Sequence, residues 1–498
     1  MNISQAKTQI KYAVQAYLSK NDLGEYEIPL ERQRPVFLVG PPGIGKTAIM
    51  AQIAQELHIG LISYSMTHHT RQSALGLPFI AHKTYRGKEY DVSEYTMSEI
   101  IASVYDVIEE TGVQEGILFL DEINCVSETL TPVMLQFLQY KEFGRHRVPD
   151  GWIVVTAGNP PEYNNSVREY DVVTLDRVKR MDVEPDFTVW KKYASASGVH
   201  PAVLTYLELK NSDFYRVENT VSGKRFVTAR SWCDLSDMLC LFEKNGLPVD
   251  ETLISQYLQE DTVAGTFAAY YDLYCSYAAE YQIETILAGE ADADTKAKAS
   301  AAKFDERLSL LGMLLERVKN EISSVILTEQ TNTALLGDFK RVRLAKAETG
   351  AGAEETLMQR AGELRLQIEL ALKSGAVGGT ERKVLTMEQI ALQSQLQSIS
   401  AASEDPEQFL QKDLTQRRAS CEKTAQRASQ MLENLFSFCE EVFGGQEMTV
   451  VVTELTAEKT NMAFLQKHGS NAYYRYAKEL LLQDRRAELL SKIGEITQ

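Results

Sequence analysis

Residues 36–57 read VFLVGPPGIGKTAIMAQIAQEL, and this stretch decides the fold. An apolar run leads into a glycine-rich loop with the spacing G-x-x-x-x-G-K-[ST], and an amphipathic helical pattern follows at once. Glycines let backbone amides curl around phosphate groups, and the start of a helix adds partial positive charge at the same point. We therefore expect a nucleotide phosphate site formed by Gly40, Pro41, Pro42, Gly43, Ile44, Gly45, Lys46 and Thr47.

Further apolar runs continue beyond this loop. They begin at Leu61, Ile117, Trp152 and Met181, and helical patterns separate them. Continuous rather than alternating apolar strands between helices are typical of a parallel sheet that is covered on both faces. The sequence thus predicts an α/β nucleotide-binding core over residues 35–185, with a five-stranded parallel sheet.

An acidic pair, Asp121-Glu122, ends the apolar run that starts at Ile117. It comes from the end of a second buried strand, where the other half of a nucleotide site is expected. Lys46 would neutralise the β- and γ-phosphates, while Thr47 and Asp121 would hold Mg²⁺. Glu122 is placed to polarise an attacking water, which is typical of a hydrolase.

The chain resembles the AAA+ ATPases, because WIVVTAGNP places Asn159 at the end of a further strand, where that superfamily has a polar residue called the first sensor. Five segments are similar, in the same order, to those of the MoxR family: GLP at Gly76, LDEIN at Leu120, VPDGW at Val148, AGNPPEY at Ala157 and TLDRV at Thr174. The resemblance covers residues from about 35 to about 240. It implies an AAA+ fold, hydrolysis of ATP with Mg²⁺, and a homo-oligomeric ring, usually a hexamer, with nucleotides between neighbouring subunits.

The resemblance also implies roles for arginines. In TLDRV, Arg177 matches the arginine finger that reaches a neighbouring subunit's γ-phosphate, with Arg180 as the alternative. In VTARSW, Arg230 matches the second sensor, which contacts the γ-phosphate of its own subunit and lets hydrolysis move a helical lid. A local ion pair at the surface is the competing interpretation for each arginine.

Two segments fall where the family carries an insertion and a hairpin near the axis of the ring. They are residues 79–96, FIAHKTYRGKEYDVSEYT, and residues 140–148, YKEFGRHRV. Contact with a substrate and a plain solvated loop are equally good interpretations of both.

The rest of the chain has mostly helical patterns. An amphipathic helix and connector occupy 1–34, and a helical lid is expected over 186–287. Residues 288–445 predict a long α-helical extension, a bundle or a coiled-coil-like hairpin, because apolar residues recur at alternating spacings of four and three. The final segment, 446–498, contains the β-like run MTVVVTEL, 448–455, and could pack back on the lid.

Composition limits the classes of function. The chain has 52 Lys and Arg against 69 Asp and Glu, a net charge of −17, which disfavours nucleic acid as a partner. No apolar run is long enough for a membrane span. Six cysteines without a C-x-x-C pair suit reduced thiols, so we expect a cytoplasmic protein.

The leading hypothesis is a MoxR-type ATPase that couples hydrolysis of Mg-ATP to remodelling or activating a protein partner. The resemblance implies a partner with a von Willebrand factor A domain. Two alternatives are an assembly scaffold with incidental turnover and a nucleic-acid translocase. Intact Glu122, Asn159 and Arg177 argue against the scaffold, and the net charge argues against the translocase.

Overall fold

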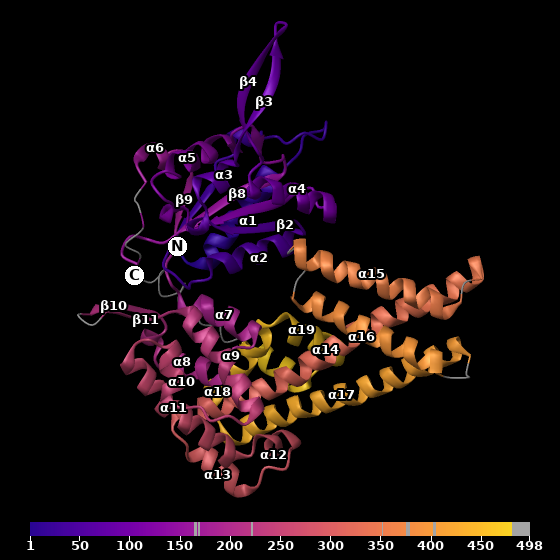
Figure 1. Cartoon of the computed structure of the whole chain (residues 1–498). Helices are drawn as coiled ribbons and strands as arrows, with labels where there is room; N and C mark the ends of the chain where they lie inside the picture. Colours follow the sequence, from indigo (N-terminus) through magenta and orange to yellow (C-terminus); the bar gives the residue numbers. More distant parts are fainter. Residues whose placement is uncertain are drawn as a thin grey trace, which may run out of the picture. The chain divides into compact units, whose positions relative to one another are not determined.

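The computed structural model divides into two compact units (Figure 1). The first comprises Met1–Val189 with Glu363–Arg382, and the second comprises Trp190–Gly362 with Lys383–Gln498. The structure describes residues 1–163, 167, 170–220, 223–350, 352–374, 379–401 and 405–480. Among these residues, no helix has both the length and the apolar character needed to cross a membrane.

A five-stranded parallel sheet forms the centre of the first unit, as predicted. Its strands run in the order β2-β5-β8-β1-β9. Their bounds are β1 (Val36–Val39), β2 (Gly60–Ser65), β5 (Gly116–Asp121), β8 (Trp152–Gly158) and β9 (Lys179–Asp182). Every residue of β1 and β8 is buried, which explains why these strands read as continuous apolar runs. The order brings the carboxyl ends of β1, β8 and β5 together at one edge.

Helices supply the apolar side chains that cover this sheet. They include α1 (Ile3–Tyr17), α2 (Lys46–Leu57), α3 (Arg71–Leu75), α4 (Glu99–Thr111), α5 (Thr131–Tyr140) and α6 (Val172–Leu175). Ile100, Val104 and Phe137 are fully buried against strand residues such as Leu118 and Leu120. Each such side chain contributes about 1.5–3 kcal/mol of burial free energy, so this core fixes the sheet edge that carries the site.

Two antiparallel hairpins occupy the segments around 79–96 and 140–148. The long hairpin pairs β3 (Pro78–Tyr85) with β4 (Lys88–Tyr95) and projects from the body of the first unit (Figure 1). The short hairpin pairs β6 (Glu142–Phe143) with β7 (His146–Arg147). Arg145 Nη1 lies 2.5 Å from Glu94 Oε1, and His146 Nε2 lies 3.2 Å from the Tyr95 carbonyl oxygen. The short hairpin therefore contacts the base of the long one.

The second unit begins with a group of helices around an aromatic core. These are α7 (Phe187–Ser197), α8 (Pro201–Leu209), α9 (Ala229–Asn245), α10 (Glu251–Tyr257), α11 (Asp261–Tyr281), α12 (Ile283–Ala288) and α13 (Ala293–Ala301), with the hairpin β10 (Arg216–Thr220) and β11 (Gly223–Val227). Tyr206, Trp232 and Phe267 are buried and meet edge-on or tilted, with ring centroids 5.2–5.7 Å apart. Aromatic pairs in this geometry stabilise a core beyond the area they bury.

Long helices form the predicted extension. They are α14 (Phe304–Thr349), α15 (Ala353–Ser374), α16 (Gly379–Ala401) and α17 (Pro406–Val442). The predicted apolar seam of α14 is buried from Leu308 to Val325 and packs with α17, whereas Phe304 is 59% exposed. Thus the fold class, an α/β core with a five-stranded parallel sheet followed by a mostly helical region, is confirmed.

A buried charge triad joins three of these helices. Arg360 Nε lies 2.9 Å from Asp338 Oδ1, and Arg360 Nη2 lies 2.8 Å from Glu388 Oε1. Asp338 Oδ2 has no hydrogen-bond partner among the described residues. Burial, followed by the neighbouring Glu388, raises the pKa of the Asp338 carboxyl. Two carboxyl groups therefore share one guanidinium here.

The β-like prediction for 448–455 is wrong, because this run lies in α18 (Gly445–Ala457). Its buried side chains, Met448, Val451, Val452 and Leu455, lie on one helix face and join the cluster that contains the seam of α14. β-Branched residues favour strands only weakly, so burial of this face decides the structure. Then α19 (Lys459–His468) and a helical stretch over 471–480 follow.

Candidate active site

The predicted phosphate loop connects β1 to α2 at the carboxyl edge of the sheet. Gly43 and Gly45 have φ angles of 76° and 93°, in the left-handed region that favours glycine. At Gly40, a Cβ atom would lie 2.8 Å from Ile44 Cδ1 and 2.9 Å from the Val183 carbonyl oxygen. The loop thus needs glycines to curl, and it delivers the chain to the start of α2, where the first backbone N–H groups lack intrahelical partners.

Lys46 links this loop to the next strand. Its side chain is only 8% exposed, and its ammonium donates to the carbonyl oxygens of Gly40 (2.7 Å) and Pro41 (2.9 Å). It also donates to Asn159 Oδ1 at 2.8 Å. Asn159 follows β8, the neighbour of β1, so strand order brings these two predicted site residues together.

Thr47 and Asp121 also meet across the edge. Thr47 Oγ1 donates to Asp121 Oδ2 at 3.2 Å, and the Glu122 backbone N–H donates to Asp121 Oδ1 at 2.8 Å. A threonine hydroxyl and a carboxylate beside a phosphate loop are hard oxygen donors of the kind that Mg²⁺ takes with waters and phosphate oxygens. The residues present therefore fit a magnesium ion.

Glu122 occupies a strained backbone position with φ 55°. Its carboxylate accepts hydrogen bonds from Ser65 Oγ (2.8 Å) and Thr67 Oγ1 (3.0 Å), which lie at the end of β2. Neither hydroxyl was predicted from the sequence. Serine and threonine after the apolar run at Leu61 were a signal, but their relevance depends on β2 being the neighbour of β5.

Asn124 is a third residue of the site that was not predicted from the sequence. It is 5% exposed, and its Nδ2 donates to the Asn159 carbonyl oxygen at 2.8 Å. A Cβ on Gly158 would lie 2.3 Å from Asn124 Oδ1, so the backbone passes very close to this amide. The turn after β5 is thereby tied to the turn after β8.

Nearby, burial raises the pKa of the Cys125 thiol, with the charges of Glu122 and Asp121 adding to the effect.

The two candidate arginine fingers differ in their surroundings. Arg180 lies in β9 and forms an exposed ion pair with Asp182, with Nη2 and Oδ1 2.8 Å apart. Arg177 is half-buried between α6 and β9 and forms no ion pair in the part of the chain that the structure describes. Among the described residues, Arg177 is therefore the candidate whose guanidinium forms no ion pair with a carboxylate.

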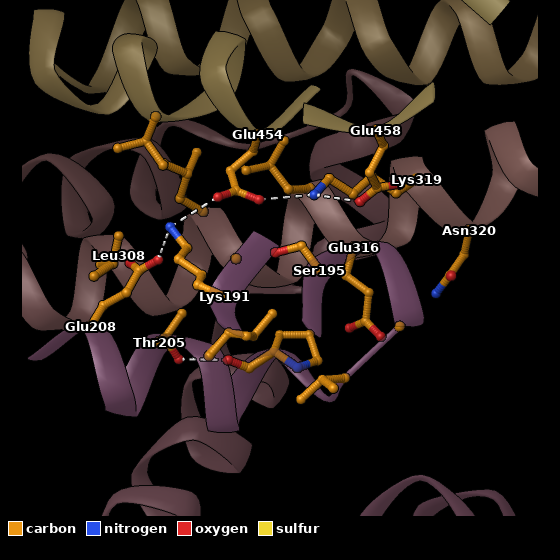
Figure 2. A pocket seen from close by; sticks show the side chains of 18 of the residues that line it. Lys191, Ser195, Thr205, Glu208, Leu308, Glu316, Lys319, Asn320, Glu454 and Glu458 are labelled. Carbon is orange, nitrogen blue, oxygen red and sulfur yellow. Dashed lines mark hydrogen bonds and ion pairs between the residues drawn. The ribbon is translucent and has the colours of Figure 1, made fainter. Parts of the chain in front are cut away.

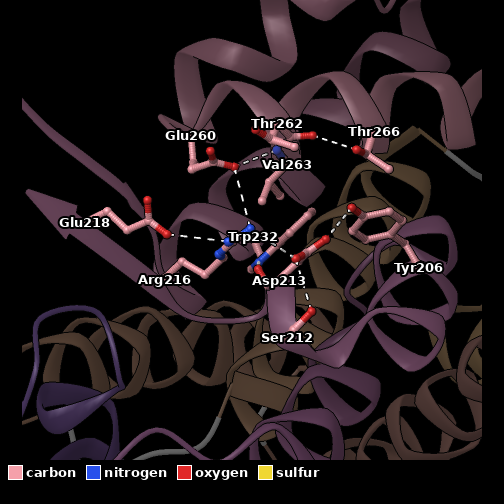
Figure 3. Close-up of polar contacts among 10 residues, drawn as sticks. All are labelled: Tyr206, Ser212, Asp213, Arg216, Glu218, Trp232, Glu260, Thr262, Val263 and Thr266. Atoms are coloured by element: carbon pink, nitrogen blue, oxygen red, sulfur yellow. Dashed lines mark hydrogen bonds and ion pairs between the residues drawn. The ribbon is translucent and has the colours of Figure 1, made fainter. Parts of the chain in front are cut away.

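Arg230 lies in the second unit, in the first turn of α9, and is exposed. Thr228 and Ser231 form a capping box that begins this helix. Four residues after the N-cap Thr228, the Trp232 indole N–H donates to the Asp213 carbonyl oxygen at 3.3 Å, as Figure 3 shows. A second hydrogen bond fixes the position of Asp213, because its Oδ2 accepts from the Tyr206 hydroxyl at 2.8 Å. The turn that carries Arg230 is thus anchored within its own unit.

Comparison with known proteins identifies the domain that contains this edge. Residues 36–171 match the model of the ATPase family associated with various cellular activities (AAA). A search of curated proteins finds no match. Among solved structures, the chain is similar to a proline-to-glycine mutant of RuvB from Thermotoga maritima, with 15% identity and a TM-score of 0.30, over 51% of this chain and 68% of that one. The loop, the acidic strand end and the family match lead to one conclusion: the chain contains an AAA ATPase domain.

Proposed function

We propose that this protein is a MoxR-type AAA+ ATPase that hydrolyses Mg-ATP in a ring and remodels or activates a protein partner. The observation that carries the proposal is the convergence of five side chains at the ends of β1, β5 and β8. They are Lys46, Thr47, Asp121, Glu122 and Asn159. These groups supply the contacts that phosphoryl transfer to water requires.

Each group has a separate task in the proposed reaction. The loop amides and Lys46 bind the β- and γ-phosphates, while Thr47 and Asp121 hold Mg²⁺. Bound Mg²⁺ supplies positive charge that offsets the charge developing on the phosphates. Glu122 accepts the proton of the water that attacks the γ-phosphorus; the bond to the bridging oxygen breaks, and ADP and phosphate are the products. Ser65 and Thr67 orient the Glu122 carboxylate.

Subunit contacts complete the site in this proposal. Arg177 reaches the γ-phosphate of the neighbouring subunit, which requires a guanidinium that is not locked in a local ion pair. Arg230 acts as the second sensor and couples the nucleotide to movement of the proposed lid. Its exposure in the first turn of α9 supports this role.

The long hairpin supports a protein as the partner. Ile80 is 68% exposed, and Phe79, Tyr85 and Tyr90 are between 45% and 50% exposed. Large apolar side chains that gather on a projecting element are typical of surfaces that contact other proteins. A protein with a von Willebrand factor A domain is the partner that we propose on the MoxR resemblance.

Binding and turnover measured separately test the ATPase proposal. Lys46→Ala should abolish binding of a fluorescent ATP analogue, whereas Glu122→Gln should bind it and release phosphate about 10²–10⁴ times more slowly. Glu109→Gln, an exposed carboxylate on α4, is the matched control and should behave as wild type. Unchanged ATP affinity in Lys46→Ala would refute the phosphate site, and wild-type turnover in Glu122→Gln would assign the base elsewhere.

Mass and mixing experiments test the ring. Light scattering of Glu122→Gln should show a shift towards a hexamer when Mg-ATP is added. Arg177→Ala should bind ATP and hydrolyse about 10³–10⁵ times more slowly. Mixing it with Lys46→Ala should restore activity, since each variant supplies the group that the other lacks. A monomer with turnover independent of protein concentration would refute the ring.

A further inference from the structure

A pocket of about 150 Å³ lies within the second unit, between α7, α8, α14 and α18 (Figure 2). Part of its wall is apolar, because Leu308, Leu311 and Leu315 of α14 line it. A cavity of this volume holds a molecule the size of benzene, so the pocket takes a ligand of roughly six non-hydrogen atoms.

The charged side chains of this pocket are mostly acidic. They are Lys191, Lys319, Glu208, Glu316, Glu454 and Glu458. Two lysines face four glutamates, so the ionised wall carries a net charge of −2. Such a wall attracts cations and repels carboxylates and phosphates.

Both lysines already have carboxylate partners. Lys191 pairs with Glu208 and with Glu454, at 2.9 Å in the second pair. Lys319 lies 3.0 Å from both Glu454 and Glu458. Three of the four glutamates therefore have a lysine partner, although the two lysines balance only two of their three charges.

Glu316 is the fourth, and its carboxylate points into the pocket (Figure 2). Within the described ranges, it has no ion pair with a lysine, arginine or histidine. Burial raises the pKa of Glu316; His200, Asn320 and Lys319 lower it, and Glu243 raises it further. A carboxylate in such a place either keeps a proton or gains a cation. The pocket offers the cation both space and an apolar wall.

We propose that this pocket binds a short aliphatic ammonium ion, with its ammonium group on Glu316 and its alkyl chain against the leucines of α14. The geometry combines a carboxylate that forms no ion pair among the described residues with apolar surface, and this pairing matches a primary alkylamine. The inference is independent of the nucleotide site, which lies in the first unit.

Isothermal titration calorimetry with n-butylammonium on the full chain at pH 8 tests the proposal. Wild type should bind saturably, and n-butanol, a neutral molecule of the same length, should bind at least tenfold more weakly, or by about 1.4 kcal/mol. Glu316→Gln should lose at least tenfold in affinity for the amine. The matched control is Glu321→Gln on the same helix, whose carboxylate pairs with Arg317 and does not line the pocket. It should bind as wild type does.

A second variant guards against a folding defect in Glu316→Gln. Ser195→Leu fills the pocket without changing charge and should also abolish binding, with thermal unfolding close to that of wild type. Binding by wild type should weaken as the pH falls, because protonation of Glu316 removes the charge that holds the ammonium group. No saturable binding, equal affinity for n-butanol, or undiminished binding by Glu316→Gln would each overturn the proposal.

Discussion

Asn159 should compete with the nucleotide for Lys46. The Lys46 ammonium donates to two loop carbonyl oxygens and, at 2.8 Å, to Asn159 Oδ1. A phosphate oxygen that approaches Lys46 must accept one of the three N–H bonds of the ammonium and so replace one of its present acceptors. The two carbonyl oxygens belong to the loop backbone, so the Asn159 side chain is the acceptor that can move away. Asn159→Ala removes this competitor, so ATP affinity should stay level or rise while hydrolysis falls.

Asn159→Asp should have the opposite effect on binding. The Lys46–Asn159 hydrogen bond already has one charged partner, and such a bond contributes about 1.5–3 kcal/mol. A second charge adds Coulomb attraction, which we take to be of the same size. The added attraction, about 1.5–3 kcal/mol, corresponds to ATP binding about 10- to 150-fold more weakly. The measurement is an equilibrium titration with a fluorescent ATP analogue and Mg²⁺, alongside phosphate release.

Asn21→Asp provides the control, because it adds the same charge at an exposed position in the connector after α1. Its ATP affinity should equal that of wild type. The reasoning fails if Asn159→Ala weakens ATP binding tenfold or more, since Asn159 would then be a binding contact rather than a competitor. It also fails if Asn159→Asp binds ATP as tightly as wild type.

Three further predictions concern stability. Gly158→Ala places a Cβ 2.3 Å from Asn124 Oδ1, so we expect a loss of about 1–3 kcal/mol in the free energy of unfolding and a lower melting temperature by calorimetry. Because the pKa of Asp338 is raised, the folded chain keeps a proton at pH values where the unfolded chain has lost it. The contribution of Asp338 to the free energy of unfolding therefore falls as pH rises above the ordinary aspartate range. Asp338→Asn should therefore gain stability relative to wild type between pH 5 and pH 8 in urea unfolding, and an equal difference at both values would contradict this. Arg360→Met leaves two buried carboxyl groups without their cation. It should lower the free energy of unfolding by about 3–5 kcal/mol at pH 8, and by less at pH 5.

The sequence predicted what depends on local pattern. Glycine spacing, the flanking strand and the following helix all lie within residues 36–57, so the phosphate loop needed no knowledge of distant contacts. Asp121 could be predicted because it ends a buried strand, and Asn159 because it directly follows one at a position that resembles the first sensor of the AAA+ ATPases. Their contacts with Lys46 and Thr47 then follow from parallel strand order.

What could not be predicted depends on tertiary neighbours. Ser65 and Thr67 gain their contacts with Glu122 only because β2 lies beside β5, an order that no local pattern encodes. Asn124 likewise depends on the close passage of Gly158. For 448–455, β-branched residues resembled a strand, and burial against the helical cluster made them a helix.

Because α14 is long, it can convert a small rotation near its start into a large displacement at its far end. Gly312, near the start of this 46-residue helix, packs so closely on α8 that a Cβ would lie 2.9 Å from Thr205 Cγ2. At about 1.5 Å per residue, Thr349 lies roughly 55 Å along the helix from this contact. A tilt of about 10° in the proposed lid helices would sweep the far end of α14 through about 10 Å, if the helix moves as a rigid rod. In the proposed mechanism, a small angular change at the nucleotide site would thus produce a displacement large enough to move a bound protein.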